Sequence, residues 1–293
     1  MPPGFQDIER AAATQLIRLA LDEDLQDEGD RTCQALIGEN ESGEVQVVAR
    51  QTGVLAGMPA AQIVFDILDP LVRCNVLLRD GSAVKPGSVI GILCGPLRSL
   101  LTGERTALNC LTHLSGVATL TRKFVAAVSS TKSKILDTRK TLPGWRVLEK
   151  YAVRVGGGTN HRMGLYDAVL IKDNHLAAWS ESRTNANLAD AIRHARDRVS
   201  AGMQIAVEVD SLDQLTDCLE GRPDIVLLDN MDGQHLSKAV ALRNRLAPDV
   251  LLEASGCITL HNVAKIAGTG VERISVGALT HSAVALDMAF DRK

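Results

Sequence analysis

Basic side chains are concentrated in one stretch of this sequence, between Asp137 and His175. That stretch holds seven lysines and arginines against four acidic residues, whereas the whole chain has 32 basic and 35 acidic residues and a net charge of −3. A guanidinium binds carboxylate or phosphate through two parallel hydrogen bonds, and an ammonium acts as a compact positive charge. We therefore predict a local binding site for a small polyanion.

The basic residues of this stretch fall into two groups. One group recurs every four residues along a predicted helix over 143–153, a spacing typical of a solvent-exposed face; it comprises Arg146, Lys150 and Arg154. The other lies at predicted strand ends or in the loop 156–162, whose three consecutive glycines let the backbone approach a ligand closely. We expect this second group to bind the anion; it comprises Arg139, Lys140, His161, Arg162 and Lys172.

Two carboxylates, Glu208 and Asp229, end successive apolar runs. The residues alone leave two roles open for them. They could hold a metal ion, or they could accept hydrogen bonds from sugar hydroxyls and stabilise positive charge at an oxocarbenium-like carbon. The seven histidines show no H-E-x-x-H or similar spacing, so we expect no dedicated zinc site.

The elements that position these groups alternate between two patterns from Lys134 onward. Short apolar runs, which predict strands buried on both faces and hence a parallel sheet, alternate with stretches of helical spacing such as 188–195 and 236–242. Parallel strands end at one edge, where α/β barrels carry their active sites. The tips after the last two runs, each followed by a predicted helix, are candidates for binding phosphate through backbone N–H groups. The six runs are 135–137, 168–172, 205–210, 225–229, 250–255 and 274–277.

Residues 1 to about 110 predict a smaller α+β domain. Helical spacing covers 8–22, strand patterns cover 44–49, 72–78 and 89–93, and a pair of helices, 104–114 and 116–128, joins this domain to the barrel.

Composition excludes several other classes of protein. Apolar residues make up 45% of the chain and aromatic residues 3%, and the charge is slightly negative, which argues against a nucleic-acid binder. No apolar run approaches the ~18 residues of a membrane span, and the first residues lack a basic stretch followed by an apolar one, so we expect a cytoplasmic protein. The six cysteines form no C-x-x-C pair and are expected to be buried thiols.

Eight ordered motifs closely resemble those of the quinolinate phosphoribosyltransferase family. The resemblance covers about residues 100–285 and extends more loosely to the earlier part. The motifs are ERTALN (104–109), DTRKTLPG (137–144), GGTNHR (157–162), KDNH (172–175), EVD (208–210), LDNM (228–231), EASG (253–256) and SVGALTH (275–281).

The resemblance implies an enzyme of de novo NAD biosynthesis. It would transfer ribose 5-phosphate from phosphoribosyl pyrophosphate to quinolinate, giving nicotinate mononucleotide, pyrophosphate and CO₂. The implied fold is an incomplete α/β barrel of six or seven parallel strands (113–277) plus an N-terminal open-faced sandwich (1–112), which the C-terminal segment 278–293 rejoins. It also implies a homodimer or higher homo-oligomer with shared sites, and Mg²⁺ carried by the pyrophosphate without a metal site on the protein.

Roles for individual residues are implied by the same resemblance. Lys140, Glu208 and Asp229 would form the catalytic set, with the two carboxylates on the ribose hydroxyls. Arg105 would enter the basic pocket from the partner subunit, beside Lys140 and Thr138. The quinolinate carboxylates would be bound by Arg139, His161, Arg162 and Lys172, and the phosphates by the backbone of Ser255, Gly256, Cys257, Val276, Gly277 and Ala278.

Three alternatives remain. A related phosphoribosyltransferase with another substrate would keep the same barrel, although two adjacent carboxylates on quinolinate account better for several clustered cations. A Schiff-base aldolase would use Lys172 as its nucleophile, and borohydride would then trap an adduct on that residue. A metabolite-binding protein without catalysis would show no pyrophosphate release.

Overall fold

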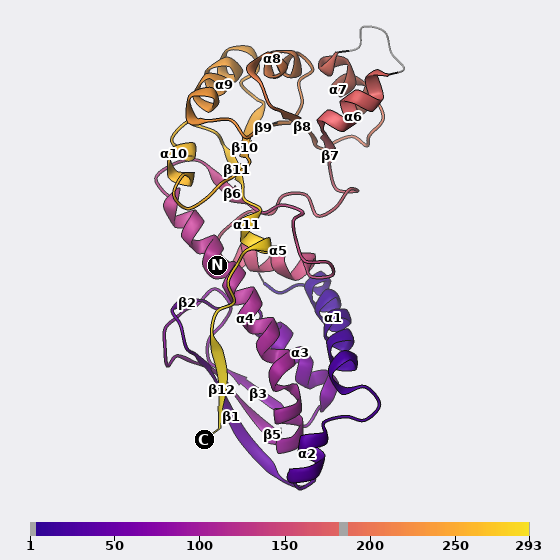
Figure 1. Ribbon diagram of the computed structural model, residues 1–293, viewed down its shortest axis with the longest axis vertical. Helices are drawn as coiled ribbons and strands as arrows, with labels where there is room; N and C mark the ends of the chain where they lie inside the picture. The colour runs from indigo at the N-terminus through magenta and orange to yellow at the C-terminus, as the bar shows by residue number, and fades with distance from the viewer. Residues whose placement is uncertain (1–3, 182–186, 293) are drawn as a thin grey trace. The chain divides into compact units, whose positions relative to one another are not determined.

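The computed structural model describes residues 4–181 and 187–292, which divide into two compact units. The first unit comprises Met1–Arg122, Lys140–Gly158 and Leu279–Lys293, and the second comprises Lys123–Arg139 and Thr159–Ala278. The elements of both units are labelled in Figure 1. None of the described helices is long and apolar enough to cross a membrane.

The first unit contains an antiparallel sheet and several helices. The sheet order is β12-β1-β5-β3, and β12 pairs with β1 so that Phe290 lies opposite Val47; the last residues of the chain thus lie beside one of its first strands (Figure 1). The strands are β1 (Ser42–Ala49), β3 (Arg73–Val76), β5 (Val89–Pro96) and β12 (Met288–Arg292), with a separate pair of β2 (Gly53–Val54) and β4 (Ala83–Val84). The helices are α1 (Asp7–Leu25), α2 (Arg31–Leu36), α3 (Met58–Leu68), α4 (Leu97–Ala127) and α5 (Arg146–Val155), and the residues of α4 from Lys123 onward belong to the second unit.

Helix α4 corrects the prediction of two joined helices. It runs without a break through Gly116, the residue at which the sequence pattern placed the division. A Cβ on Gly116 would lie 2.3 Å from the carbonyl oxygen of Val284. The glycine therefore serves a close approach of the chain to the helix and does not end the helix.

Helix α5 also differs from its prediction. It begins at Arg146 and not at Pro143, because Leu142 to Trp145 form a turn in which Gly144 has a φ of +80°. The predicted solvent-exposed face is wrong for Lys150, which is fully buried, while Arg154 lies 2.6 Å from Glu9 of α1. Packing of α5 against α1 overrides the local charge pattern.

The second unit contains the six-stranded parallel sheet that the six apolar runs predict. Its order is β6-β11-β10-β9-β8-β7, so β6 and β7 are edge strands and the barrel is incomplete. Its strands are β6 (Lys134–Leu136), β7 (Val169–Ile171), β8 (Ile205–Val209), β9 (Ile225–Asp229), β10 (Leu251–Ser255) and β11 (Arg273–Ser275). Its helices are α6 (Asp173–Ser180), α7 (Leu188–Arg196), α8 (Leu212–Glu220), α9 (Gly233–Leu246) and α10 (Val263–Ala267). Helix α11 (Ala278–His281) comes after β11, and its residues from Leu279 onward belong to the first unit.

The cysteines match their prediction in part. Cys33, Cys110 and Cys218 are buried, and burial raises the pKa of the Cys110 thiol to about 12. Cys74 and Cys94 are half-buried. Cys257 is exposed, so the prediction of a buried thiol is wrong there, because this residue lies in the turn after β10.

Candidate functional site

Strand register places the predicted tip residues on one face of the sheet. Glu208 and Glu253 both pair with Leu227, and Ser255 pairs with Asp229, which lies two residues beyond Leu227 on β9. Side chains two residues apart on a strand point to the same face. Glu208, Asp229 and Ser255 therefore share a face at the carboxyl edge of three neighbouring strands.

Lys172 joins this group through a direct contact. It comes directly after β7, and its Nζ lies 2.5 Å from Oε2 of Glu208 on β8. The lysine side chain is 42% exposed and that of Glu208 is 20% exposed, so both remain accessible from solvent. A cation predicted to bind quinolinate and a carboxylate predicted to bind ribose are thus ion-paired, and an anionic substrate must compete with Glu208 for Lys172.

The turns after β9 and β10 pack closely against each other. The Asn230 Nδ2 donates a hydrogen bond to Oδ2 of Asp229 at 2.8 Å, and the Asn230 N–H donates to the Ser255 carbonyl at 2.9 Å. Asn230 has a φ of +54°, a left-handed conformation that asparagine tolerates better than most residues. It orients Asp229, and sequence reasoning did not single it out; the signal was an Asn directly after a strand-ending Asp.

Gly256 is required at this contact. Its φ is +94°, and a Cβ there would lie 2.0 Å from the Asn230 Oδ1. Cys257 continues the turn with a φ of +48°.

The two predicted phosphate-binding tips differ in the helix that comes after each of them. Helix α10 begins only at Val263 and has five residues, so the turn after β10 does not lead directly into a helix. After β11, α11 begins at Ala278 and has four residues. Neither short helix offers the N-terminus that the sequence pattern predicted, and the backbone N–H groups of the turns themselves become the candidates for phosphate binding.

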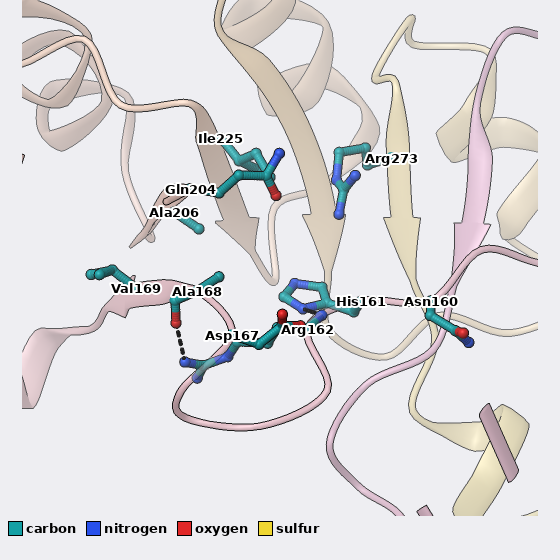
Figure 2. Close-up of a pocket in the computed structure, with 10 residues that line it drawn as sticks. All are labelled: Asn160, His161, Arg162, Asp167, Ala168, Val169, Gln204, Ala206, Ile225 and Arg273. Atoms are coloured by element: carbon teal, nitrogen blue, oxygen red, sulfur yellow. Dashed lines mark hydrogen bonds between the residues drawn. The ribbon is translucent and has the colours of Figure 1, made fainter. Parts of the chain in front are cut away.

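Two of the predicted anion-binding cations of the second unit, Arg139 and Arg162, interact electrostatically. The Arg162 Nη1 donates to the carbonyl of Ala168 at 2.9 Å, drawn as a dashed line in Figure 2. Desolvation and, after it, the positive charge of Arg139 lower the pKa of the Arg162 guanidinium, against the opposing effect of Asp167. Two guanidinium groups that repel each other favour a bound anion, since its negative charge offsets the repulsion.

A buried carboxylate fixes the loop that carries Arg162. Asp137, directly after β6, is fully buried and accepts hydrogen bonds from Asn160 Nδ2 at 2.5 Å and from the His161 N–H at 2.9 Å. Thr159 also pairs with Leu136 as an isolated bridge on β6. The loop is therefore attached to the end of a core strand.

The His161 ring contacts the protein through both of its nitrogens. Its Nδ1 accepts a hydrogen bond from the Arg162 N–H at 2.7 Å, and its Nε2 lies 3.2 Å from Oε1 of Glu253. Both ring nitrogens thus face protein groups in this conformation. The sequence resemblance assigned His161 to a quinolinate carboxylate, and that role stays a prediction.

A cavity of about 170 Å³ opens beside this loop (Figure 2). Val169, Ile225 and Arg273 are the first residues of their strands and Gln204 precedes β8, so the cavity lies toward the amino ends of the strands. Of the predicted site residues, His161 and Arg162 line it. Its lining residues are Asn160, His161, Arg162, Asp167, Ala168, Val169, Gln204, Ala206, Ile225 and Arg273.

Two predicted site residues belong to the first unit. Arg105 is exposed in the first third of α4, and the carbonyl of the exposed Lys140 accepts a hydrogen bond from Thr280 at 2.7 Å. Their predicted roles beside the strand ends are untested. Within residues 4–181 and 187–292, no group of three or more His, Cys, Asp or Glu side chains is arranged to hold a metal ion.

Comparison with known proteins gives matches over nearly the whole chain. Residues 30–115 match the family model described as quinolinate phosphoribosyl transferase, N-terminal domain, and residues 117–291 match the C-terminal domain of the same family. A carboxylating nicotinate-nucleotide pyrophosphorylase of Mycobacterium leprae is 46% identical over 289 residues, covering 98% of this chain and 99% of the relative. A probable enzyme of the same description from Bacillus subtilis is 41% identical, covering 90% of this chain and 88% of the relative.

Solved structures agree with the sequence relatives. The nicotinate-nucleotide pyrophosphorylase of Francisella tularensis matches with a TM-score of 0.89 and 38% identity over 100% of both chains. That of Ehrlichia chaffeensis matches with a TM-score of 0.88 and 37% identity, over 96% of this chain and 98% of the other.

Proposed function

Because this chain belongs to the quinolinate phosphoribosyltransferase family, we propose that it acts as a carboxylating nicotinate-nucleotide pyrophosphorylase of NAD biosynthesis. It transfers the phosphoribosyl group of phosphoribosyl pyrophosphate to the ring nitrogen of quinolinate, and nicotinate mononucleotide, pyrophosphate and CO₂ result. The observation that carries the proposal is the grouping of Lys172, Glu208 and Asp229 on one face at the strand ends.

Substrate binding is a problem of charge. Quinolinate is a dianion and phosphoribosyl pyrophosphate carries several negative charges, so the two repel each other unless cations lie between them. We assign the quinolinate carboxylates to Arg139, Arg162 and Lys172. The repulsion between Arg139 and Arg162 supports this assignment, because a dianion offsets it.

Loss of pyrophosphate is the step in which the carboxylates act. The bond between the anomeric carbon and the pyrophosphate oxygen breaks with its electron pair on oxygen, and the lone pair of the ring nitrogen forms the new bond to carbon. Positive charge develops on the ribose, and Glu208 and Asp229 stabilise it while they hold the hydroxyls; a well-placed group of this kind contributes roughly 2.7–4 kcal/mol. Since Asn230 occupies Oδ2 of Asp229, we assign Oδ1 to a ribose hydroxyl.

Decarboxylation is then driven by the chemistry of the ring. The carbon–carbon bond to the carboxylate beside the ring nitrogen breaks, its electron pair stays on the ring carbon, and the adjacent pyridinium charge stabilises the carbanion until a proton replaces CO₂. This step uses no nucleophilic side chain. Arg139, Arg162 and Lys172 keep the ring in place while it proceeds.

Magnesium fits this reaction as part of the substrate. Glu208 is paired with Lys172 and Asp229 with Asn230, and the described residues hold no cluster of three acidic, His or Cys ligands. As the resemblance implies, Mg²⁺ would enter bound to the pyrophosphate of the substrate, and Lys140 would supply a further positive charge to the reaction.

Four further expectations accompany the proposal. The domain boundaries at 112 and 278 stay a prediction. We also propose a homodimer in which Arg105 of each subunit completes the partner's site, and a cytoplasmic location. The turns Ser255–Cys257 and Val276–Ala278 are proposed to bind phosphate through backbone N–H groups.

A direct experiment tests the proposed function. Purified protein is mixed with Mg²⁺ and phosphoribosyl pyrophosphate, and pyrophosphate release is measured after addition of quinolinate or of nicotinate, which lacks the second carboxylate. We expect release with quinolinate and none with nicotinate. Release with nicotinate alone would assign the chain to a related transferase, and a borohydride-trapped adduct on Lys172 would favour the aldolase alternative.

A further inference from the structure

Three side chains, Arg273, Glu253 and His161, contact one another in sequence inside the second unit. Arg273 at the start of β11 donates from Nε to Oε2 of Glu253 on β10 at 2.7 Å, and Oε1 of the same carboxylate lies 3.2 Å from Nε2 of His161. Arg273 and His161 both line the cavity (Figure 2). Glu253 connects them and is itself completely buried.

The charge state of Glu253 is set by its neighbours. Desolvation alone would raise its pKa, but His161 and then Arg273 outweigh that effect and hold the pKa of the carboxyl below its ordinary value. The carboxylate is therefore ionised inside the barrel. Its Oε1 accepts no well-aligned hydrogen bond among the described residues, so the His161 ring is the group nearest to satisfying it.

The two contacts of the His161 ring select one tautomer. Nδ1 accepts the Arg162 N–H and so carries no proton, which leaves the proton of the neutral ring on Nε2, facing Glu253. A carboxylate that faces one ring nitrogen holds the proton on that nitrogen and leaves the other nitrogen free to accept a hydrogen bond. Partners of this kind also fix the tautomer of catalytic and metal-bound histidines.

The same loop is held from a second direction. Asp137, also fully buried, accepts from Asn160 and from the His161 N–H. The backbone of His161 is thus attached to the end of β6 and its ring to the middle of β10. Arg162 is the next residue, and its N–H is one of the groups that the ring holds.

We infer that Glu253 is a positioning residue: with Arg273 as its counter-charge, it holds the His161 ring as the Nε2–H tautomer and so fixes the loop that presents Arg162 to the anionic substrate. This inference rests on the proposed function only for the identity of that substrate. It gives His161 a role through the loop that is separate from its predicted contact with a quinolinate carboxylate.

Glu253→Gln is the variant that tests this role. If the amide oxygen faces Arg273, its NH₂ faces Nε2 of His161, and two donors then oppose each other. Nε2 can accept a hydrogen bond from that NH₂ only if the ring proton moves to Nδ1. A proton on Nδ1 would then oppose the Arg162 N–H, which donates to Nδ1 in the wild type. We therefore expect the loop to be displaced.

Two readouts report on this displacement. In protein labelled with ¹⁵N-histidine, and with the His161 signal assigned by its absence in His161→Gln, the wild type should show a bare Nδ1 and a protonated Nε2, and Glu253→Gln should lose that pattern. Steady-state kinetics should show KM for quinolinate raised about tenfold or more, because a misplacement of about 1 Å can cost up to about 100-fold. KM for phosphoribosyl pyrophosphate should change much less.

Glu272→Gln supplies a matched control. Glu272 lies in the same unit, forms an ion pair with the buried Arg243 at 2.6 Å and accepts a hydrogen bond from the Leu252 N–H at 3.0 Å, and neither of these partners is a predicted site residue. It should lose stability without changing the His161 spectrum or KM for quinolinate. If Glu253→Gln fails to fold, the double variant Glu253→Leu/Arg273→Leu removes both charges of the pair, leaves the Nε2–H of His161 without an acceptor at residue 253, and carries the same expectations.

The two readouts also separate this inference from the proposed function. An unchanged His161 spectrum, or a quinolinate KM that moves no more than in Glu272→Gln, overturns the positioning role even in a fully active enzyme. Absence of quinolinate-dependent pyrophosphate release in the wild type would instead refute the proposed function, and the spectrum would still test the ring contact.

Discussion

Replacing Gly256 by alanine tests the packing of the two turns that carry Asp229 and the predicted phosphate-binding backbone. The new Cβ would meet two obstacles at once. The backbone of residue 256 has a φ of +94°, and the Cβ would lie 2.0 Å from the Asn230 Oδ1 and 3.0 Å from its backbone nitrogen.

The expected loss of stability is the sum of these two effects. A side chain with a left-handed backbone conformation costs about 1–2 kcal/mol. The Asn230 amide must also turn away and give up its hydrogen bond to the Asp229 carboxylate, which contributes about 1.5 kcal/mol at the lower end for bonds to charged groups. We expect Gly256→Ala to lower the free energy of unfolding by about 3 kcal/mol, and each kcal/mol lowers Tm by about 2–4 °C in a domain of this size.

Gly202→Ala separates the two effects. Gly202 lies in the same unit with a φ of +87°, and a Cβ there has no atom within 4 Å. This control should lose only the conformational part, about 1–2 kcal/mol, and keep its kinetics. In Gly256→Ala, KM for phosphoribosyl pyrophosphate should rise, because Asp229 loses the group that orients it.

Denaturant unfolding and steady-state kinetics of both variants give the answer. Asn230→Ala and the double variant Gly256→Ala/Asn230→Ala complete a double-mutant cycle. Both single changes remove the same hydrogen bond, so the loss of unfolding free energy in the double variant should be about 1.5 kcal/mol smaller than the sum of the two single losses. Equal losses of stability in Gly256→Ala and Gly202→Ala, with an unchanged KM for phosphoribosyl pyrophosphate, would refute the close contact between the turns.

Charged side chains of the site and its surroundings give four more predictions. Lys172→Ala and Arg162→Ala should each raise KM for quinolinate about tenfold or more with little change in Tm, since charge-assisted bonds are worth about 1.5–3 kcal/mol; a loss of ~2–5 kcal/mol in stability would make them structural residues instead. Glu208→Gln should lower kcat more than it raises KM, because its carboxylate acts on charge that develops as pyrophosphate leaves; an unchanged kcat in steady-state assays would leave it only a sugar-binding role. Inactive Arg105→Ala and Lys172→Ala chains, unfolded together and reassembled, should regain roughly a quarter of wild-type activity if Arg105 serves the partner's site. Half of the randomly paired dimers are then hybrids, and each hybrid has one intact site of two. No recovery of activity would contradict shared sites. The pKa of Glu253 is depressed in the folded chain, so this carboxylate stabilises the fold at pH values above its ordinary pKa of 4.5, and the stabilisation is lost as pH falls through the folded pKa. The free energy of unfolding of Glu253→Gln should therefore depend less on pH in acid than that of the wild type.

The barrel was predictable because its strands are short continuous apolar runs. The run at 225–229 coincides with β9, and the run at 205–210 exceeds β8 by one residue. Once the strands are parallel, Glu208 and Asp229 must reach the same edge, so much of the site's composition is determined by the sequence.

Other features depend on contacts between distant segments. Glu253 stands inside an apolar strand pattern, its Arg273 partner is 20 residues later, and its His161 partner comes from the loop after Thr159. Lys150 carries a pattern typical of a helix surface, yet the packing of α5 buries it. Gly116 lies inside the unbroken α4 because the backbone at Val284 approaches it closely, and this contact cannot be read from the sequence around Gly116.

The stoichiometry of the reaction tests the proposed activity most directly. Quinolinate labelled with ¹³C in the carboxylate beside the ring nitrogen is mixed with the protein, Mg²⁺ and phosphoribosyl pyrophosphate, and labelled CO₂, pyrophosphate and nicotinate mononucleotide are measured together. We expect the three products to appear in equal amounts and only when both substrates are present. Pyrophosphate released without labelled CO₂, or at the same rate when quinolinate is omitted, would contradict the proposed activity.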